Sequence, residues 1–208
     1  RRRRHDTEND LRRIKMERNE HTSMDIPYIR LTMFRPDLLN IPEAALPEGY
    51  SIRHFQPGDE AHWAYIEQAA GEFKTTEAAR EHFEREFGSD IAAMRQRCLF
   101  LVDAQGQPVG TTTAWSGLWD GETIGRIHWV AIVPEHQGKK LSKPLLSAAL
   151  QTMAAYHTQA YLTTQTTSYK AVGMYLNYGF APVMKTPTCA DGWKLMEQLL
   201  GKPIYQKY

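Results

Sequence analysis

The pattern of hydrophobic and polar positions is clearest over residues 127–153, where its period changes from that of a strand to that of a helix. Residues 127–133 form an apolar, β-rich run, and Pro134 ends it because proline has no N–H to give to a sheet. A polar turn follows over residues 135–140. Apolar side chains then recur at steps of three and four residues, at Leu141, Leu145, Leu146, Ala149 and Met153. This spacing is typical of an amphipathic helix, so the pattern predicts a strand, a tight turn and a helix in succession.

Comparable patterns on both sides predict the other elements. In chain order they are a strand at 50–55, a helix from Pro57 through Ala70, a helix from Thr75 or Thr76 to about Phe87, a hairpin of 98–103 with 108–115, the central strand, turn and helix, a strand at 160–164, a helix at 169–177, a strand at 180–184 and a short final helix around Trp193. The strand at 160–164 follows a crossover helix, so it should run parallel to the central strand.

The two segments before residue 48 differ from the rest in composition. Residues 1–23 are polar and begin with four arginines, so they are predicted to form a flexible charged tail. Residues 24–47 contain four prolines and scattered apolar side chains, which indicates an extended segment packed on the domain. Residues 48–208 are then expected to form one α/β domain.

Composition narrows the function classes. The chain has 208 residues, 42% hydrophobic and 24% charged, with a formal net charge of +1. Such a balance does not favour nucleic acid or a membrane surface as a partner. Cys98 and Cys189 lie far apart, so no disulfide framework and no metal site are expected. A cytoplasmic location fits this cysteine usage and the lack of a signal-peptide pattern.

The turn after the central strand also matches a known motif. Val133, Pro134, Gln137 and Gly138 fit V-x-P-x-x-[RQ]-G-x-G-x-[GA], whereas Lys140 and Ser142 replace small residues. In the segment 168–180, a second pattern, N-x-x-A-x-x-x-Y-x-x-x-G-F, is matched at Ala171, Tyr175, Gly179 and Phe180, with Ser168 in place of Asn. With both motifs in order, the chain resembles the GNAT acetyltransferase superfamily over roughly residues 49–184.

The resemblance implies a fold and a coenzyme site. The fold would be a mixed β-sheet with helices on both faces. The turn would hold the pyrophosphate of acetyl-CoA with backbone N–H groups at a helix N-terminus, a favourable place for an anion. The implied coenzyme-binding residues are Ala131, Ile132, Val133, Gln137, Gly138, Lys139, Lys140, Leu141, Ser142, Ser168, Ala171 and Tyr175. Because Pro144 lacks an N–H, the regular helix should begin after Lys140 or distort near Pro144. An ordinary strand-to-helix turn with solvated lysines is the alternative.

Two residues are candidates for proton transfer. The resemblance implies that Tyr175 is the general acid that protonates the departing thiolate, and a phenol is protonated at neutral pH. His128 stands where related arylalkylamine acetyltransferases carry a histidine that helps to deprotonate the amine. A packed tyrosine and a hydrogen-bonded core histidine are the alternatives. Some relatives have a glutamate where this chain has Arg126.

If a carboxylate is the base, the candidates are Glu72, Glu77 and Glu122. Four aromatic residues are candidates for the wall of the acceptor site, although aromatic side chains also fill cores: Trp63, Phe73, Trp115 and Trp119.

The predicted function is transfer of an acetyl group from acetyl-CoA to a primary amine by direct attack. The acceptor, a small molecule or a peptide or protein amine, stays open, as does the oligomeric state, with a homodimer among the options. A catalytically inactive module that binds acyl-CoA is the competing hypothesis, supported by the departures at Lys140 and Ser142. Nucleic-acid binding through Arg1 to Arg4 is a third class, and it predicts a strongly salt-dependent affinity.

Overall fold

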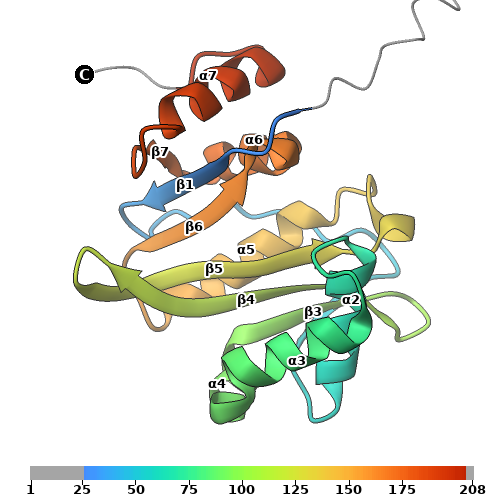
Figure 1. The fold of residues 1–208 in the computed structure, drawn as a ribbon. Helices are drawn as coiled ribbons and strands as arrows, with labels where there is room; N and C mark the ends of the chain where they lie inside the picture. The colour runs from blue at the N-terminus through green and yellow to red at the C-terminus, as the bar shows by residue number, and fades with distance from the viewer. Residues whose placement is uncertain (1–25, 205–208) are drawn as a thin grey trace, which may run out of the picture.

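A mixed seven-stranded sheet organises the protein (Figure 1). A computed structural model describes residues 26–204, so the predicted tail over residues 1–23 lies outside the described residues. The strands are β1 (Arg30–Arg35), β2 (Ser51–His54), β3 (Cys98–Val102), β4 (Pro108–Trp119), β5 (Glu122–Ile132), β6 (Ala160–Gln165) and β7 (Ala181–Val183). Their order in the sheet is β2-β3-β4-β5-β6-β1-β7.

Helices cover both faces of this sheet. They are α2 (Asp59–Ala69), α3 (Thr76–Phe87), α4 (Ile91–Arg97), α5 (Ser142–Ala154), α6 (Tyr169–Asn177) and α7 (Cys189–Leu200). Figure 1 shows α2 and α3 in front of the strands and α5 behind them. The expected mixed sheet between helices is thus confirmed.

Strands β5 and β6 separate after a short contact. They form the parallel pair of the sheet, and they pair at Gly125 with Ala160 and at Arg126 with Tyr161. Both strands continue beyond these pairs, β5 to Ile132 and β6 to Gln165. Because the two strands run on without pairing, the sheet opens at its middle.

Most expected elements are present, including the hairpin of β3 with β4, the N-cap of α3 at Thr75, and the final helix α7. The helix α5 begins at Ser142, after Lys140, as the position of Pro144 required. Helix α4 was not predicted. Asp90 caps it by accepting a hydrogen bond from the N–H of Ala93, and it follows α3 after one 3-10 turn.

The segment before residue 48 contributes a strand that the sequence did not predict. Strand β1 lies between β6 and β7 and pairs antiparallel with both. Its Leu31 and Met33 are fully buried, whereas Tyr28, just before the strand, is 70% exposed. The buried Arg35 donates hydrogen bonds to the carbonyls of Tyr178 and Asp37. Residues near the N-terminus therefore complete the sheet beside β6.

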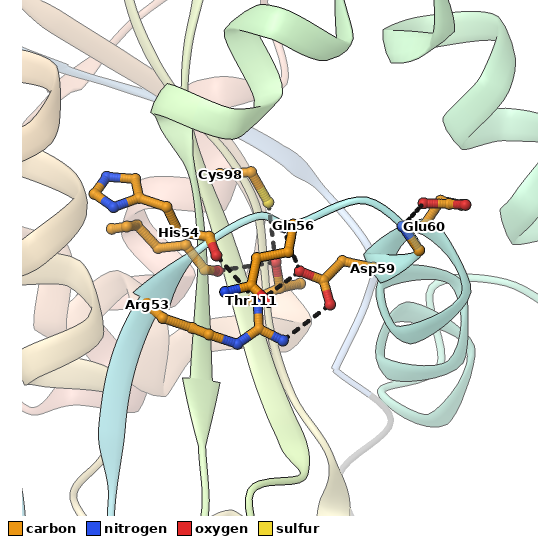
Figure 2. A network of polar contacts seen from close by, with 9 residues as sticks. Arg53, His54, Gln56, Asp59, Glu60, Cys98 and Thr111 are labelled. Atoms are coloured by element: carbon orange, nitrogen blue, oxygen red, sulfur yellow. Dashed lines mark hydrogen bonds and ion pairs between the residues drawn. The ribbon is translucent and has the colours of Figure 1, made fainter.

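A polar network anchors α2 to the edge strand β2 (Figure 2). Arg53 binds Asp59 through two hydrogen bonds of 2.5 and 2.9 Å, a bidentate ion pair. Asp59 also accepts a hydrogen bond of 2.6 Å from the N–H of Gln56. Because Asp59 is the first residue of α2, these contacts fix the start of the helix that lines the candidate site described next.

Candidate active site

A cavity of about 300 Å³ lies where β5 and β6 separate. Residues 127–130 of β5 form one wall, and residues 162–165 of β6 form the opposite wall. Helix α2 contributes Glu67, and α6 contributes Tyr175. The volume is at the lower end of the range for ligand pockets, which favours a small ligand or the reacting end of a larger one.

A β-bulge shapes the wall at β5. Thr111 pairs with Ala131 and Thr113 pairs with His128, so Trp129 and Val130 together stand opposite Thr112. Trp129 has φ of 52°, a conformation that is rare for a bulky residue. Such a bulge leaves one residue of the strand unpaired and redirects its side chain. The bulge therefore interrupts the ladder at the strand that lines the cavity.

Glu86 on α3 holds this bulge in place. Its carboxylate accepts hydrogen bonds of 2.8 Å from Trp129 Nε1, 2.6 Å from His128 Nε2 and 2.8 Å from His82 Nε2. Burial alone would raise the pKa of Glu86, but these hydrogen bonds outweigh it and lower the pKa to about 2. Glu86 is therefore a carboxylate at neutral pH, aligned on the imidazole of His128.

The hydrogen bond to Glu86 fixes the tautomer of His128. Because Nε2 donates its proton to Glu86, the lone pair of the neutral ring is on Nδ1. Burial lowers the pKa of His128, and the hydrogen bond to Glu86 opposes part of this effect. A neutral imidazole beside a carboxylate can accept a proton and be stabilised as the cation.

Tyr175 lies on the other side of the cavity. It is 6% exposed, and within the described residues no hydrogen bond engages its hydroxyl. Burial, and secondarily the negative charge of Glu72, raise the pKa of Tyr175. The phenol is therefore protonated and has a proton to donate into the cavity.

The three glutamates considered as bases differ in position. Glu72 lines the cavity, whereas Glu77 and Glu122 do not. The residue that contacts His128 is Glu86, which the sequence analysis did not name. Its one sequence signal is the spacing of four residues from His82, which places both on the same face of α3.

The four aromatic residues expected in the wall of the acceptor site pack against other side chains, outside the wall of the cavity. Trp63 is fully buried and packs against Phe73 and Trp129. Trp115 contacts Phe87, and Trp119 stacks on Phe34. None of Trp63, Phe73, Trp115 and Trp119 lines the cavity.

The loop after β5 has the features of an anion cradle. Gly138 has φ of 75°, and a Cβ added there would meet nothing within 4 Å. Within the described chain, no side chain caps the N-terminus of α5, so its first N–H groups are available to a ligand. Lys139, Lys140 and Lys143 are exposed beside them. The residues present thus fit a phosphate group.

The coenzyme-binding residues implied by the resemblance fall into two groups. Ser168, Ala171 and Tyr175 line the cavity itself. The other predicted residues lie along the end of β5, the following turn and the start of α5, outside the cavity walls: Ala131, Ile132, Val133, Gln137, Gly138, Lys139, Lys140, Leu141 and Ser142. Gln137 fixes the turn by donating a hydrogen bond of 2.8 Å from Nε2 to the carbonyl of Ile132.

Lys140 occupies a backbone conformation that favours glycine. Its φ is 62°, in the left-handed region. We expect Lys140→Gly to raise the free energy of unfolding of the ligand-free protein by up to about 1 kcal/mol, because a non-glycine residue is strained there. Denaturant unfolding measures the change. Lys139→Gly is the matched control, and a Lys140→Gly protein no more stable than Lys139→Gly would contradict the assignment of strain.

Comparison with known proteins gives the family. The model of the acetyltransferase (GNAT) family matches residues 58–180, more than half of the chain. The chain belongs to the GNAT acetyltransferase family. The resemblance seen in the two sequence motifs is therefore confirmed, and the cavity between β5 and β6 lies within a domain of this family.

The relatives are acetyltransferases of greater length. A mycothiol acetyltransferase from Streptomyces griseus is 29% identical, over 68% of this chain and 46% of its own length. Another, from Pseudarthrobacter chlorophenolicus, is 31% identical, over 73% of this chain and 48% of its own length. This GNAT chain thus spans about half the length of the curated relatives it matches.

Solved structures support the fold. A GCN5-related N-acetyltransferase from Sphaerobacter thermophilus has a TM-score of 0.58 at 20% identity, over 84% of this chain and 53% of its own. A tandem GNAT protein from the clavulanic acid biosynthesis pathway has a TM-score of 0.53 at 20% identity, over 76% of this chain and 51% of its own.

Two features are absent from residues 26–204. No helix among them has the length and apolar character needed to cross a membrane. No group of three or more His, Cys, Asp or Glu side chains in this range is arranged to hold a metal ion.

Proposed function

We propose that the protein transfers an acetyl group from acetyl-CoA to a primary amine. The observation that carries this proposal is the convergence of two proton-transfer groups on one cavity. His128, aligned by Glu86, stands on one wall, and the protonated Tyr175 stands on another. Attack of an amine on a thioester needs one group that accepts a proton and one that donates a proton.

The coenzyme would be held by the loop after β5. The N–H groups from Gly138 to Ser142 and the charges of Lys139 and Lys140 suit its pyrophosphate. When bound, acetyl-CoA supplies an activated acyl group as a thioester. The opening between β5 and β6 leads from this end of the sheet to the cavity, and Ser168 and Ala171 line it.

Four groups then have defined tasks in the transfer. His128 takes a proton from the amine at Nδ1, and Glu86 stabilises the resulting imidazolium. Tyr175 gives its hydroxyl proton to the leaving sulfur. The backbone N–H of Val130, in the bulge, is the proposed donor to the acetyl carbonyl oxygen, a role that a fixed dipole performs well.

The names of the relatives add a candidate acceptor. They are called mycothiol acetyltransferases, so a mycothiol-type amine belongs in the acceptor panel beside amino acids, polyamines and peptides. Release of free thiol from acetyl-CoA in the presence of each amine tests the function. If coenzyme A binds but no amine releases thiol, the protein is instead a binding module without turnover.

A negative charge introduced at Gly138 tests whether the loop after β5 binds coenzyme A. We expect Gly138→Asp to weaken coenzyme A binding far more than Gly138→Asn or Ser142→Ala, because only aspartate sets a negative charge against the pyrophosphate. Asparagine has the same shape and tolerates a positive φ almost equally, so it controls for backbone strain. Calorimetric titration, or the thermal shift that a ligand of the native state produces, measures the affinity. Equal affinities for the aspartate and asparagine variants would remove the loop from the coenzyme site.

A further inference from the structure

Glu67 is an unusual residue for the wall of this cavity. It lies on α2, it is fully buried, and neither carboxyl oxygen has a hydrogen-bond partner among the described residues. It nevertheless lines the cavity, next to Glu72. Burial, and secondarily the charge of Glu72, raise the pKa of Glu67 well above its usual value. An unsatisfied buried carboxyl group is unfavourable unless a ligand satisfies it.

Arg126 faces the same cavity from β5. Its Nε is buried without a hydrogen-bond partner, and in the part of the chain that the structure describes Arg126 makes no ion pair. Its charge acts on His128, so the guanidinium lies close to the proposed base. A guanidinium offers several N–H groups in one plane, a geometry that matches a carboxylate.

The two groups do not neutralise each other. Residues 26–204 contain no ion pair between Glu67 and Arg126, although both line a cavity of about 300 Å³. The cavity therefore presents two groups without an ion-pair partner to a ligand, the carboxyl group of Glu67 and the guanidinium of Arg126. A ligand that carries both an ammonium and a carboxylate would give a partner to both groups, the ammonium to Glu67 and the carboxylate to Arg126.

We propose that the acceptor is a free amino acid, its ammonium bound at Glu67 and its carboxylate bound at Arg126. This proposal rests on the proposed function and names its substrate class. The amine then lies in the cavity that His128 and Tyr175 share, and the carboxylate is held on the strand that carries His128. A peptide N-terminus or a simple alkylamine has the ammonium but no adjacent carboxylate, so it leaves Arg126 unpaired.

Matched acceptors and one variant test the proposal. Each acceptor is supplied in three forms, as the amino acid, its carboxamide and the amine that lacks the carboxyl group, for histidine, methionine and lysine. The parent protein should show a kcat/KM about 10²-fold higher for the best amino acid than for its two analogues, the size expected for a buried charge pair. Arg126→Met should abolish this preference, so that kcat/KM for the amino acid falls about 10²-fold more than kcat/KM for the carboxyl-free amine. Arg95→Met, at an exposed position of α4 outside the cavity, should retain the preference.

Glu67→Gln tests the other end. A bound ammonium stabilises the ionised form of Glu67, which an amide cannot adopt, so the variant should lower kcat/KM for the amino acid and for the carboxyl-free amine alike. The amide has nearly the same shape and removes no existing contact, so the fold should be retained, which thermal unfolding checks.

The outcomes separate this proposal from the proposed function. If other amines release thiol but no amino acid is preferred, or if Arg126→Met weakens all three forms equally, the proposal is overturned and the acetyltransferase function stands. If no amine releases thiol, the proposed function fails, and calorimetric titration with the amino acids decides the inference. Amino-acid binding that Arg126→Met abolishes supports it, and no binding overturns it.

Discussion

Tyr175→Phe is expected to lower kcat by about 10²–10⁴, the usual contribution of a positioned acid or base. The substitution keeps the ring, which is buried and packs against Phe180, and removes only the hydroxyl. Since no hydrogen bond within the described residues engages this hydroxyl, its loss should leave the fold intact. Steady-state assays of thiol release measure the effect, and calorimetric titration should give an unchanged affinity for coenzyme A.

Tyr169→Phe is the matched control. Tyr169 begins the same helix but does not line the cavity, so this variant should keep the parent rate. A Tyr175→Phe enzyme with full activity would remove the assignment of Tyr175 as the acid and return it to a packing role.

The sequence predicted the fold best where the pattern is local. The change from an apolar run to steps of three and four residues placed the end of β5, its turn and α5, although β5 begins five residues before the predicted run, at Glu122. Pro144 placed the start of α5, because its missing N–H acts within one turn of the chain. These features depend on neighbouring residues alone, and neighbouring residues are visible in one sequence.

Strand β1 could not be predicted in the same way. Leu31 and Met33 are two residues apart, as in a strand, but the pairing partners of β1 lie in β6 and β7, more than a hundred residues later. Prolines on both sides of the strand also favour an irregular segment. The tertiary partner, and not local propensity, makes this segment a strand.

The residues of the candidate site also differ in whether the sequence alone could predict them. Tyr175 was identified through the second motif and His128 through its place relative to arylalkylamine acetyltransferases, and both line one cavity in the structure. Glu86, Glu67 and Arg126 lie on α3, α2 and β5, and only the folded chain brings them near His128, so no single segment encodes their arrangement. In the sequence, Arg126 is only the residue that replaces a glutamate of some relatives, and the proposed amino-acid site gives it a role.

The pH dependence of kcat/KM tests the assignment of His128 as the base. If His128 is the base, activity is lost as pH falls through its pKa, because the protonated ring cannot accept a proton. Burial lowers the pKa of His128, so this acidic limb should lie below the ordinary histidine value of about 6.5. His128→Gln should remove the limb and lower turnover by about 10²–10⁴.

Glu86→Gln separates a positioning role from a direct one. The carboxylate stabilises the imidazolium, so its removal should lower the pKa of His128 further and move the acidic limb to still lower pH. A residue that merely packed would change the rate without moving the limb. His54→Gln, at an exposed position on β2, is the control and should reproduce the parent profile. All profiles are recorded with the same acceptor. Titration of the acceptor's own amine then contributes equally to the parent and the variants, so a difference between their profiles comes from the protein. An unchanged acidic limb in His128→Gln would return this histidine to a structural role beneath the bulge.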